Sequence, residues 1–210
     1  MPIAREGWPL VLVPLGLAVV LFLVRWPWTA GVFLALALFT AFFFRDPDRR
    51  APDDPRLVLS PADGKVVVAG PAPAGNPLGE GATQVSVFLS IFDVHVNRSP
   101  VGGRISRVEY HEGEFLPAFQ DKASLANEQN SVTIDVREGG PSVNFKQIAG
   151  LIARRIVFKK KVGDTVAAGE RVGMIKFGSR VDVFLPRDVR LRVKKGDRVV
   201  AGVSALGERP

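Results

Sequence analysis

The chain contains no cysteine and very little histidine, and these two absences exclude several kinds of chemistry at once. Without Cys there can be no disulfide, no thiolate nucleophile and no cysteine metal site. His95 and His111 are the only 2 histidines among 210 residues, which is too few for a histidine metal site. A single Tyr, with all 3 Trp residues before residue 30, leaves few aromatic side chains for stacking on bases. We therefore expect neither a metal nor a nucleic-acid partner.

The charge balance and the N-terminus point instead to a membrane. A formal net charge of +7 indicates an anionic partner, and an acidic membrane surface is one such partner. Residues 9–24 and 29–44 are uncharged apolar runs on either side of Arg25-Trp26-Pro27-Trp28. As a helix of about 16 residues, each run is roughly 24 Å long, slightly less than a hydrocarbon core of about 30 Å. Pro27 would break the helix, and the flanking Trp side chains suit a membrane interface.

We therefore predict that residues 1–44 form a hydrophobic helical hairpin that either crosses the bilayer or dips into it. A hairpin buried in a protein core is the alternative. Arg5 before the first apolar run and Arg45, Arg49 and Arg50 after the second outnumber Arg25 in the turn, which places both ends in the cytoplasm. The charged, Pro-rich residues 45–56 form a linker. The soluble domain, 57–210, would then lie on the cytoplasmic face of the inner membrane.

Short β-like runs, punctuated by Gly, Pro and Val, fill this soluble domain. We expect strands at 57–59, 65–69, 84–91, 93–97, 104–110, 131–137, 142–149, 153–159, 171–176, 180–185 and 189–194, and a helical or irregular insert at 122–130. A Gly-Asp-x-Val-x-Ala-Gly pattern occurs at residues 163–169 and again at 196–202. It resembles the hammerhead repeats of biotinyl and lipoyl carrier domains. The predicted fold is therefore mainly β, a barrel-sandwich-hybrid-like domain behind the helical hairpin.

The Gly178-Ser179 pair lies between the two copies of that pattern and joins the runs 171–176 and 180–185. The second run alternates between two faces, Val181-Val183-Leu185 on one and Arg180-Asp182-Phe184 on the other. One interpretation is an ordinary hairpin turn, in which Gly adopts a positive φ. The other is self-cleavage, because a Ser hydroxyl can attack the preceding Gly carbonyl and, after elimination and hydrolysis, leave a pyruvoyl group. The dipeptide alone is compatible with both.

Two further stretches contain candidate chemistry, and each also has a structural interpretation. Asp63-Gly64 precedes a strand, where such a pair is most often only a turn. In an extended run Asp93, His95 and Asn97 share one face, so that a polar stripe with a His crosses an apolar strand. This stripe suggests a site, although a single His is more often structural.

Four motifs follow one another along the soluble domain: Ser60-Pro61-Ala62-Asp63-Gly64, Phe92-Asp93-Val94-His95-Val96-Asn97-Arg98-Ser99-Pro100, Asn127-Glu128-Gln129-Asn130 and Phe177-Gly178-Ser179-Arg180. In this order they resemble phosphatidylserine decarboxylase, in the short proenzyme form found in bacteria and archaea. The N-terminal apolar hairpin also fits the short form. Each motif alone is weak, whereas four in the family's order are specific.

The resemblance implies that the proenzyme cuts itself between Gly178 and Ser179. The products would be a β chain, 1–178, and an α chain, 179–210, blocked by a pyruvoyl group made from Ser179. This covalent cofactor would form a Schiff base with the amine of phosphatidylserine and act as the electron sink when CO2 leaves. Hydrolysis would then release phosphatidylethanolamine, and no metal would take part.

The resemblance also implies roles for single residues. Asp63 matches the family aspartate that assists cleavage, and His95 matches the histidine linked to decarboxylation, our candidate to protonate the α-carbon. Where the longer bacterial form has a second histidine, this chain has Arg98, whose always-charged guanidinium cannot act as a general base. Either His95 serves both steps, or Asp63 acts on Ser179 without a second histidine. Arg98 and Lys176 are candidate contacts for the substrate headgroup.

The expected partners are the phospholipid substrate, the bilayer and the chain's own two fragments, with the oligomeric state left open and a homodimer as one option. Two other functions remain. A non-enzymatic, membrane-anchored barrel-sandwich adaptor would need no chain cleavage, and such adaptors usually carry long coiled-coil heptads, which are absent from this sequence. A pyruvoyl decarboxylase of a different lipid would keep the chemistry and change the substrate.

Overall fold

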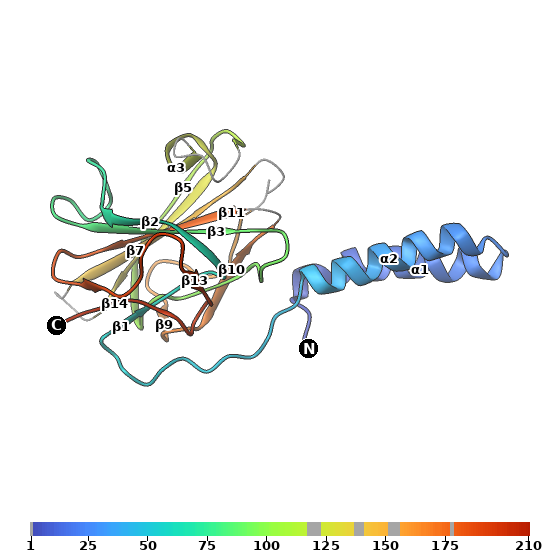
Figure 1. Ribbon diagram of the computed structural model, residues 1–210, viewed down its shortest axis with the longest axis horizontal. Coiled ribbons are helices and arrows are strands. Elements are labelled where there is room, and N and C mark those ends of the chain that lie inside the picture. Colours follow the sequence, from blue (N-terminus) through green and yellow to red (C-terminus); the bar gives the residue numbers. More distant parts are fainter. Residues whose placement is uncertain (1, 117–122, 137–140, 151–155, 177–178) are drawn as a thin grey trace. The chain divides into compact units, whose positions relative to one another are not determined.

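The computed structural model describes residues 2–116, 123–136, 141–150, 156–176 and 179–210 (Figure 1). The chain divides into two compact units, Met1–Asp48 and Arg49–Pro210. The boundary between them falls inside residues 45–56, the stretch that the sequence predicts as a linker.

The first unit is a hairpin of apolar helices. It contains a short 3-10 turn and two α-helices, η1 (Arg5–Gly7), α1 (Trp8–Leu23) and α2 (Pro27–Phe43). Arg25 takes a positive φ of 63° in the connection, and Pro27 starts α2, where a missing amide hydrogen costs nothing. The two ends of the hairpin are joined, because the Ala4 amide donates to the Phe44 carbonyl oxygen at 2.8 Å. The predicted helical hairpin is confirmed, and Figure 1 shows α1 and α2 side by side.

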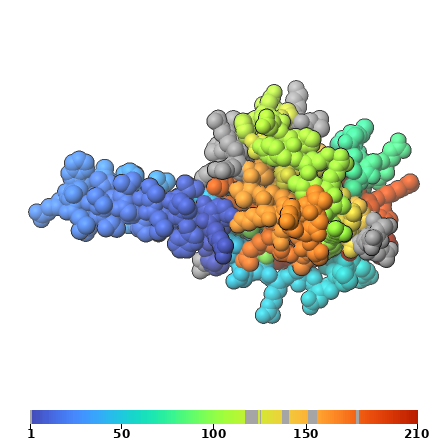
Figure 2. Space-filling model, turned by 180° about the vertical axis from the view of Figure 1, so that it is seen from behind, coloured from blue at the N-terminus to red at the C-terminus, as the bar shows by residue number. Residues whose placement is uncertain are grey.

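This helical unit exposes most of its large apolar side chains, which cover the helices drawn in blue in Figure 2. Trp28 is 91% exposed and Leu23 is 72% exposed, whereas small residues such as Ala18 and Ala30 are buried. By length and composition the helical stretch Arg5–Leu23 can cross a membrane, while Pro27–Phe43 is shorter. An exposed apolar surface of this kind marks contact with a membrane or with another protein.

In its described residues the second unit is built from three antiparallel sheets and one short helix, α3 (Ala123–Ala126). The largest sheet is curled and has eight strands, in the spatial order β13 (Arg198–Val199), β2 (Gly64–Pro71), β3 (Thr83–Leu89), β11 (Ser179–Leu185), β7 (Ser142–Ile148), β6 (Gln129–Asp135), β5 (Gly103–His111) and β9 (Thr165–Val166). The two smaller sheets have three strands each, β4 (Val96–Arg98), β10 (Arg171–Ile175) and β8 (Ile156–Phe158), then β1 (Leu57–Leu59), β14 (Ala205–Glu208) and β12 (Arg190–Leu191). The predicted mainly β fold is confirmed.

β11 is the central strand of this unit. It pairs with β3 on one side and with β7 on the other, and all seven of its residues are buried. Val181, Val183 and Leu185 point into the main apolar core, as the alternation in the sequence predicts. The other face carries Arg180 and Asp182, which are buried as well and therefore need polar partners.

The Gly-Asp-x-Val-x-Ala-Gly repeat is part of a larger internal duplication. Equivalent hydrogen bonds, each 2.8 Å from amide nitrogen to carbonyl oxygen, join Gly163 to Ile105 and Gly196 to Val66, and Gly169 to Ser99 and Gly202 to Ser60. The segments that receive these bonds, 60–66 and 99–105, therefore correspond to each other. Asp63 of the first copy stands where the second copy has Gly102.

Several predicted elements differ in extent from the observed ones, and the run expected at 189–194, for example, contains only β12 (Arg190–Leu191). Alternation over 93–97 predicts a strand, but β4 begins only at Val96. The Asp93 carboxylate accepts hydrogen bonds from the Ser90 amide at 2.9 Å and the Ser90 hydroxyl at 2.8 Å, and such side-chain caps favour a turn. His95 thus lies in a connection rather than on a strand face. In the described part of the insert predicted at 122–130, the helix is the four-residue α3, and β6 already starts at Gln129.

Candidate active site

Ser179 is the first residue of β11 and is completely buried. It pairs with Leu89 of β3, and because it lies two residues from Val181 its side chain faces the core side of the sheet. Within the described ranges the Ser179 Oγ has no hydrogen-bond partner. A buried hydroxyl without a partner is unfavourable and calls for an explanation, such as a chemical role. Gly178, the other half of the predicted cleavage site, lies outside the described residues.

His95 lies beside the end of β10, the strand that leads toward Ser179. Its carbonyl oxygen accepts a hydrogen bond from the Ile175 amide at 3.4 Å. The ring is fully buried, and its Nδ1 lies 2.9 Å from the Asp93 carbonyl oxygen. A carbonyl oxygen can only accept, so this contact places the proton of a neutral ring on Nδ1 and leaves Nε2 as the reactive nitrogen.

Asp63 is held by Arg49 and by the main chain. Arg49 donates from Nη1 to Oδ1 at 2.6 Å and from Nη2 to Oδ2 at 2.8 Å, and the Ala201 amide donates to Oδ1 at 2.8 Å. The pair is largely shielded from water, with side-chain exposures of 10% for Arg49 and 14% for Asp63. These three hydrogen bonds fix the Asp63 carboxylate. Their donors are Arg49 and Ala201, and neither Ser179 nor His95 is among them.

Gly64 fixes the backbone beside Asp63. Its φ is +147°, and a Cβ there would lie 2.0 Å from the Phe88 carbonyl oxygen, so only Gly fits. Lys65 and Arg180 both pair with Phe88, from opposite sides of β3. β2 and β11 are therefore separated by two strand spacings, about 10 Å. The structure brings Asp63 to the same end of the sheet as Ser179 without a contact between them.

A chain of three buried amides lies on the same face of the sheet as Ser179. Asn130 Nδ2 donates to Gln147 Oε1 at 3.0 Å, and Gln147 Nε2 donates to Asn97 Oδ1 at 2.9 Å. These bonds orient each amide, so that Asn97 Nδ2 remains as a donor with no acceptor in the described part of the chain. Gln147 pairs with Val181, which makes Gln147 and Ser179 diagonal neighbours about 7–8 Å apart.

Gly173 makes room for this amide chain. It pairs with Asn97, and a Cβ at Gly173 would lie 3.2 Å from Gln147 Nε2 and 2.2 Å from the Val157 carbonyl oxygen. The sequence analysis places Asn97 in a polar stripe without a role of its own, and it misses Gln147. The position of Gln147 in its strand could have revealed it. Gln147 lies two residues after the core residue Phe145 and so on the same inward face of the strand, where a polar side chain is the exception.

The two candidate headgroup contacts have different surroundings. Arg98 is 5% exposed, and its Nη1 donates to the Gly169 carbonyl oxygen at 2.9 Å, which ties β4 to a turn of the internal repeat. Lys176 directly follows β10 and is partly exposed. Neither placement by itself identifies a ligand contact.

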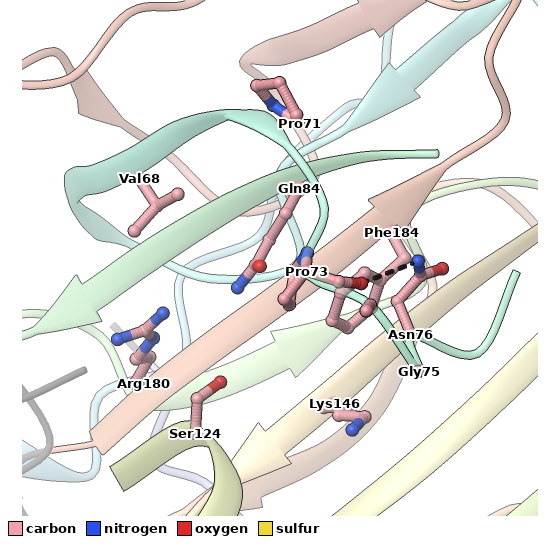
Figure 3. Close-up of a pocket in the computed structure, with 11 residues that line it drawn as sticks. Val68, Pro71, Pro73, Gly75, Asn76, Gln84, Ser124, Lys146, Arg180 and Phe184 are labelled. Carbon is pink, nitrogen blue, oxygen red and sulfur yellow. Dashed lines mark hydrogen bonds between the residues drawn. The ribbon is translucent and has the colours of Figure 1, made fainter. Parts of the chain in front are cut away.

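The opposite face of β11 borders a pocket of about 350 Å³ (Figure 3). Polar side chains from four elements line it, namely Arg180 of β11, Gln84 of β3, Lys146 of β7 and Ser124 of α3. Burial lowers the pKa of Lys146 below its ordinary 10.5, although the carboxylates of Asp182 and Glu109 act in the opposite direction. The sequence prediction names none of the four as a site residue.

The side chains around Ser179 can support attack by its hydroxyl on a neighbouring carbonyl. The site offers a buried nucleophile, an oriented amide donor at Asn97 and an imidazole at His95. Among the residues that the structure describes, no group of three or more His, Cys, Asp or Glu side chains could hold a metal ion.

Comparisons with known proteins agree with these motifs. The family model of phosphatidylserine decarboxylase matches residues 36–207. A phosphatidylserine decarboxylase proenzyme of Geotalea uraniireducens is 46% identical over 209 residues, which cover 100% of this chain and 97% of the relative. The protein of the same name from Solibacter usitatus is 52% identical over 187 residues, which cover 87% of each chain. The one from Symbiobacterium thermophilum is 47% identical over 208 residues, which cover 99% of this chain and 96% of the relative. The chain therefore belongs to the phosphatidylserine decarboxylase family of enzymes.

Proposed function

We propose that this chain is a proenzyme that cuts itself between Gly178 and Ser179 and then converts phosphatidylserine to phosphatidylethanolamine and CO2. The observation that best supports the proposal is the buried Ser179 hydroxyl at the start of the central strand, which has no partner in the described ranges. The relatives' printed names, which include the word proenzyme, agree with it.

Cleavage would begin when Ser179 Oγ attacks the Gly178 carbonyl carbon. The peptide C–N bond breaks, the hydroxyl proton passes to the nitrogen, and Gly178 becomes an ester on the serine oxygen. Elimination then breaks the Cα–H and Cβ–O bonds, so that a base takes the α-proton, Gly178 leaves as a carboxylate and dehydroalanine remains at position 179. Its imine tautomer exchanges nitrogen for a water oxygen and releases ammonia, so that residue 179 ends as a pyruvoyl group.

Three side chains would assist this cleavage, each in a different way. Asn97 Nδ2 would donate to the carbonyl oxygen that becomes negative during the attack, since Gln147 already occupies the other end of its amide. His95 Nε2 would accept the Ser179 proton, because Nδ1 is engaged with a main-chain carbonyl. Asp63 would hold this end of the sheet through Arg49 and Ala201, as a positioning residue.

In decarboxylation the pyruvoyl carbonyl supplies the electron sink for the pair that remains when the carboxylate leaves as CO2. The chain's own contribution is burial and proton control. The site is lined by fully buried side chains, so water reaches it poorly and proton delivery must come from a defined group. His95, as an imidazolium, would return a proton from Nε2 to the α-carbon.

The helical hairpin would hold this chemistry at the lipid surface. The exposed apolar side chains of α1 and α2 fit a bilayer, and the positive residues that flank them favour the cytoplasmic side. We therefore place the β-rich unit on the cytoplasmic face of the inner membrane. Only the headgroup of the substrate then needs to leave the bilayer and enter the site, while the acyl chains stay in the lipid.

Intact-mass spectrometry of the denatured protein tests the proposal, with Ser179→Ala as the variant and Ser106→Ala, an exposed position, as the matched control. We expect two chains, 1–178 and 179–210, in the wild type and in Ser106→Ala, and one uncut chain in Ser179→Ala. The smaller chain should weigh less than a plain hydrolysis fragment by the mass of one ammonia. A single uncut wild-type chain, or a fragment with an ordinary Ser at its N-terminus, would overturn the pyruvoyl mechanism. CO2 release from phosphatidylserine vesicles then tests the substrate.

A further inference from the structure

The pocket on the outer face of β11 combines a polar floor with an apolar wall. In Figure 3 the ends of Arg180, Ser124, Lys146 and Gln84 surround one space, and the loop after β2 covers it with Pro73. A volume of about 350 Å³ lies within the range of ligand pockets, roughly 300–1,000 Å³. Few polar groups set against an apolar wall are typical of a site for a small ligand with one charged end.

Arg180 is held rigidly with one donor left over. Its Nε donates to Asp182 Oδ1 at 2.6 Å and its Nη2 to Ser86 Oγ at 2.9 Å. The side chain lines the pocket at 2% exposure, and its Nη1 has no partner among the described residues. A buried cationic N–H without an acceptor is costly, so the arrangement is complete only when an acceptor enters the pocket.

The charges of the pocket also favour an anion. The Asp182 carboxylate neutralises the charge of Arg180 through Oδ1, and its Oδ2 accepts a hydrogen bond from the Ser124 hydroxyl. Both carboxylate oxygens of Asp182 are therefore engaged. Lys146 forms no ion pair with a described residue, and its ammonium lies 5.5 Å from the centroid of the Phe184 ring. Lys146 therefore places an ammonium that has no ion-pair partner among the described residues beside the free Arg180 donor, although the Asp182 and Glu109 carboxylates act on it from a longer distance.

We propose that this pocket binds a phosphate-type anion, either the phosphodiester of a phospholipid headgroup or free phosphate, with Arg180 Nη1 and Lys146 Nζ as donors. Arg180 directly follows residue 179, so a headgroup attached at the start of β11 can extend around the strand end to this face. The phospholipid headgroup as the source of the anion rests on the proposed function, whereas the binding of an anion in this pocket does not. A guanidinium and an ammonium together match the oxygens of a phosphate.

Isothermal titration of the full chain carrying Ser179→Ala tests the site without cleavage or turnover. The two probes are glycerophosphoserine, the headgroup without acyl chains, and inorganic phosphate. The variants are Lys146→Met and the paired change Arg180→Gln/Asp182→Asn, which removes the buried ion pair as a unit and so avoids an isolated charge. Lys65→Met and Arg190→Gln, at exposed positions, are the matched controls.

We expect Lys146→Met to weaken binding about 10-fold and the paired variant about 10- to 100-fold, with no change in the controls. Binding of glycerophosphoserine alone identifies the headgroup as the source, and equal binding of inorganic phosphate identifies free phosphate. The proposal is overturned if neither probe binds, or if Lys146→Met and the paired variant bind as tightly as the controls. In the cleaved enzyme Lys146→Met should raise KM for phosphatidylserine about 10-fold, with the mass of the α chain unchanged. If that chain never forms while the probes still bind, only the proposed function fails.

Discussion

Replacing Gln147 by Leu should destabilise the β-rich unit strongly, although the side-chain volume changes little. The substitution removes the acceptor of Asn130 Nδ2 at 3.0 Å and the donor to Asn97 Oδ1 at 2.9 Å. Asn97 is 0% exposed and Asn130 is 4% exposed, so water cannot replace the lost partner at either amide. An unsatisfied buried polar group costs about 1–3 kcal/mol, and two of them cost about 2–6 kcal/mol. We therefore expect the free energy of unfolding to fall by about 4 kcal/mol.

The matched control replaces the whole amide chain. In the triple variant Asn97→Val/Gln147→Leu/Asn130→Val no amide of this chain of three is left to lose its partner, and substitution of both members of a hydrogen bond by apolar groups is nearly neutral. We expect the triple variant to lie within about 1 kcal/mol of the parent, and thus to be more stable than Gln147→Leu alone. Urea denaturation in the Ser179→Ala background, followed by circular dichroism, measures all three proteins without interference from cleavage.

Two results would refute this reasoning. Gln147→Leu could lose less than about 1 kcal/mol, or the triple variant could be the less stable of the two. The same triple variant, with Ser179 restored, separates folding from chemistry. If Asn97 Nδ2 stabilises the oxygen attacked by Ser179, self-cleavage should slow about 100- to 1,000-fold although the protein is folded. Cleavage at the wild-type rate would remove Asn97 from the mechanism.

Gly64→Ala should cost about 3 kcal/mol, because its φ of +147° disfavours a side chain and a Cβ would lie 2.0 Å from a carbonyl oxygen. Gly70→Ala on the same strand, where a Cβ meets nothing within 4 Å, should change stability by less than about 1 kcal/mol in the same denaturation assay. Arg49→Gln should lower the free energy of unfolding by about 3 kcal/mol, because it leaves the shielded Asp63 carboxylate without its cation. Adding Asp63→Asn should recover part of that loss, and equal denaturation midpoints of the single and double variants would contradict this. Burial lowers the pKa of Lys146 in the folded protein below its ordinary 10.5. At neutral pH the buried ammonium therefore destabilises the fold, and this destabilisation is lost as the pH rises from the lowered pKa to 10.5. Lys146→Met should therefore stabilise the fold more at neutral pH than near pH 10.5, and a pH-independent difference would contradict it.

The strands around the site are predictable because their side chains alternate. Val181, Val183 and Leu185 mark one face of β11, and the expected run 180–185 differs from the observed strand only by Ser179. The segment before β4 resists the same reasoning, since the carboxylate of Asp93 caps a turn through Ser90. Alternation cannot reveal such a cap, because the side chain competes with the strand through local hydrogen bonds.

Contacts that join distant strands are also hidden from a single sequence. Gln147 and Asn97 belong to strands of two different sheets, β7 and β4, and meet only through the tertiary fold, so no local pattern relates them. The pocket of Arg180 and Lys146 is another such case, formed by the register between β11 and β7. The net charge of +7 predicts an anionic partner, but the charge alone does not locate a site.

The internal duplication separates the two halves of the Asp63-Gly64 pair. Gly103, the counterpart of Gly64, is equally unable to take a side chain, because its Cβ would lie 2.3 Å from the Asp135 carbonyl oxygen. The glycine is therefore required by the turn in both copies. Gly102, the counterpart of Asp63, has no side chain, yet the second copy forms the equivalent hydrogen bonds. The turn folds without a carboxylate in the second copy, so the turn requires the Gly of this pair and does not by itself require the Asp.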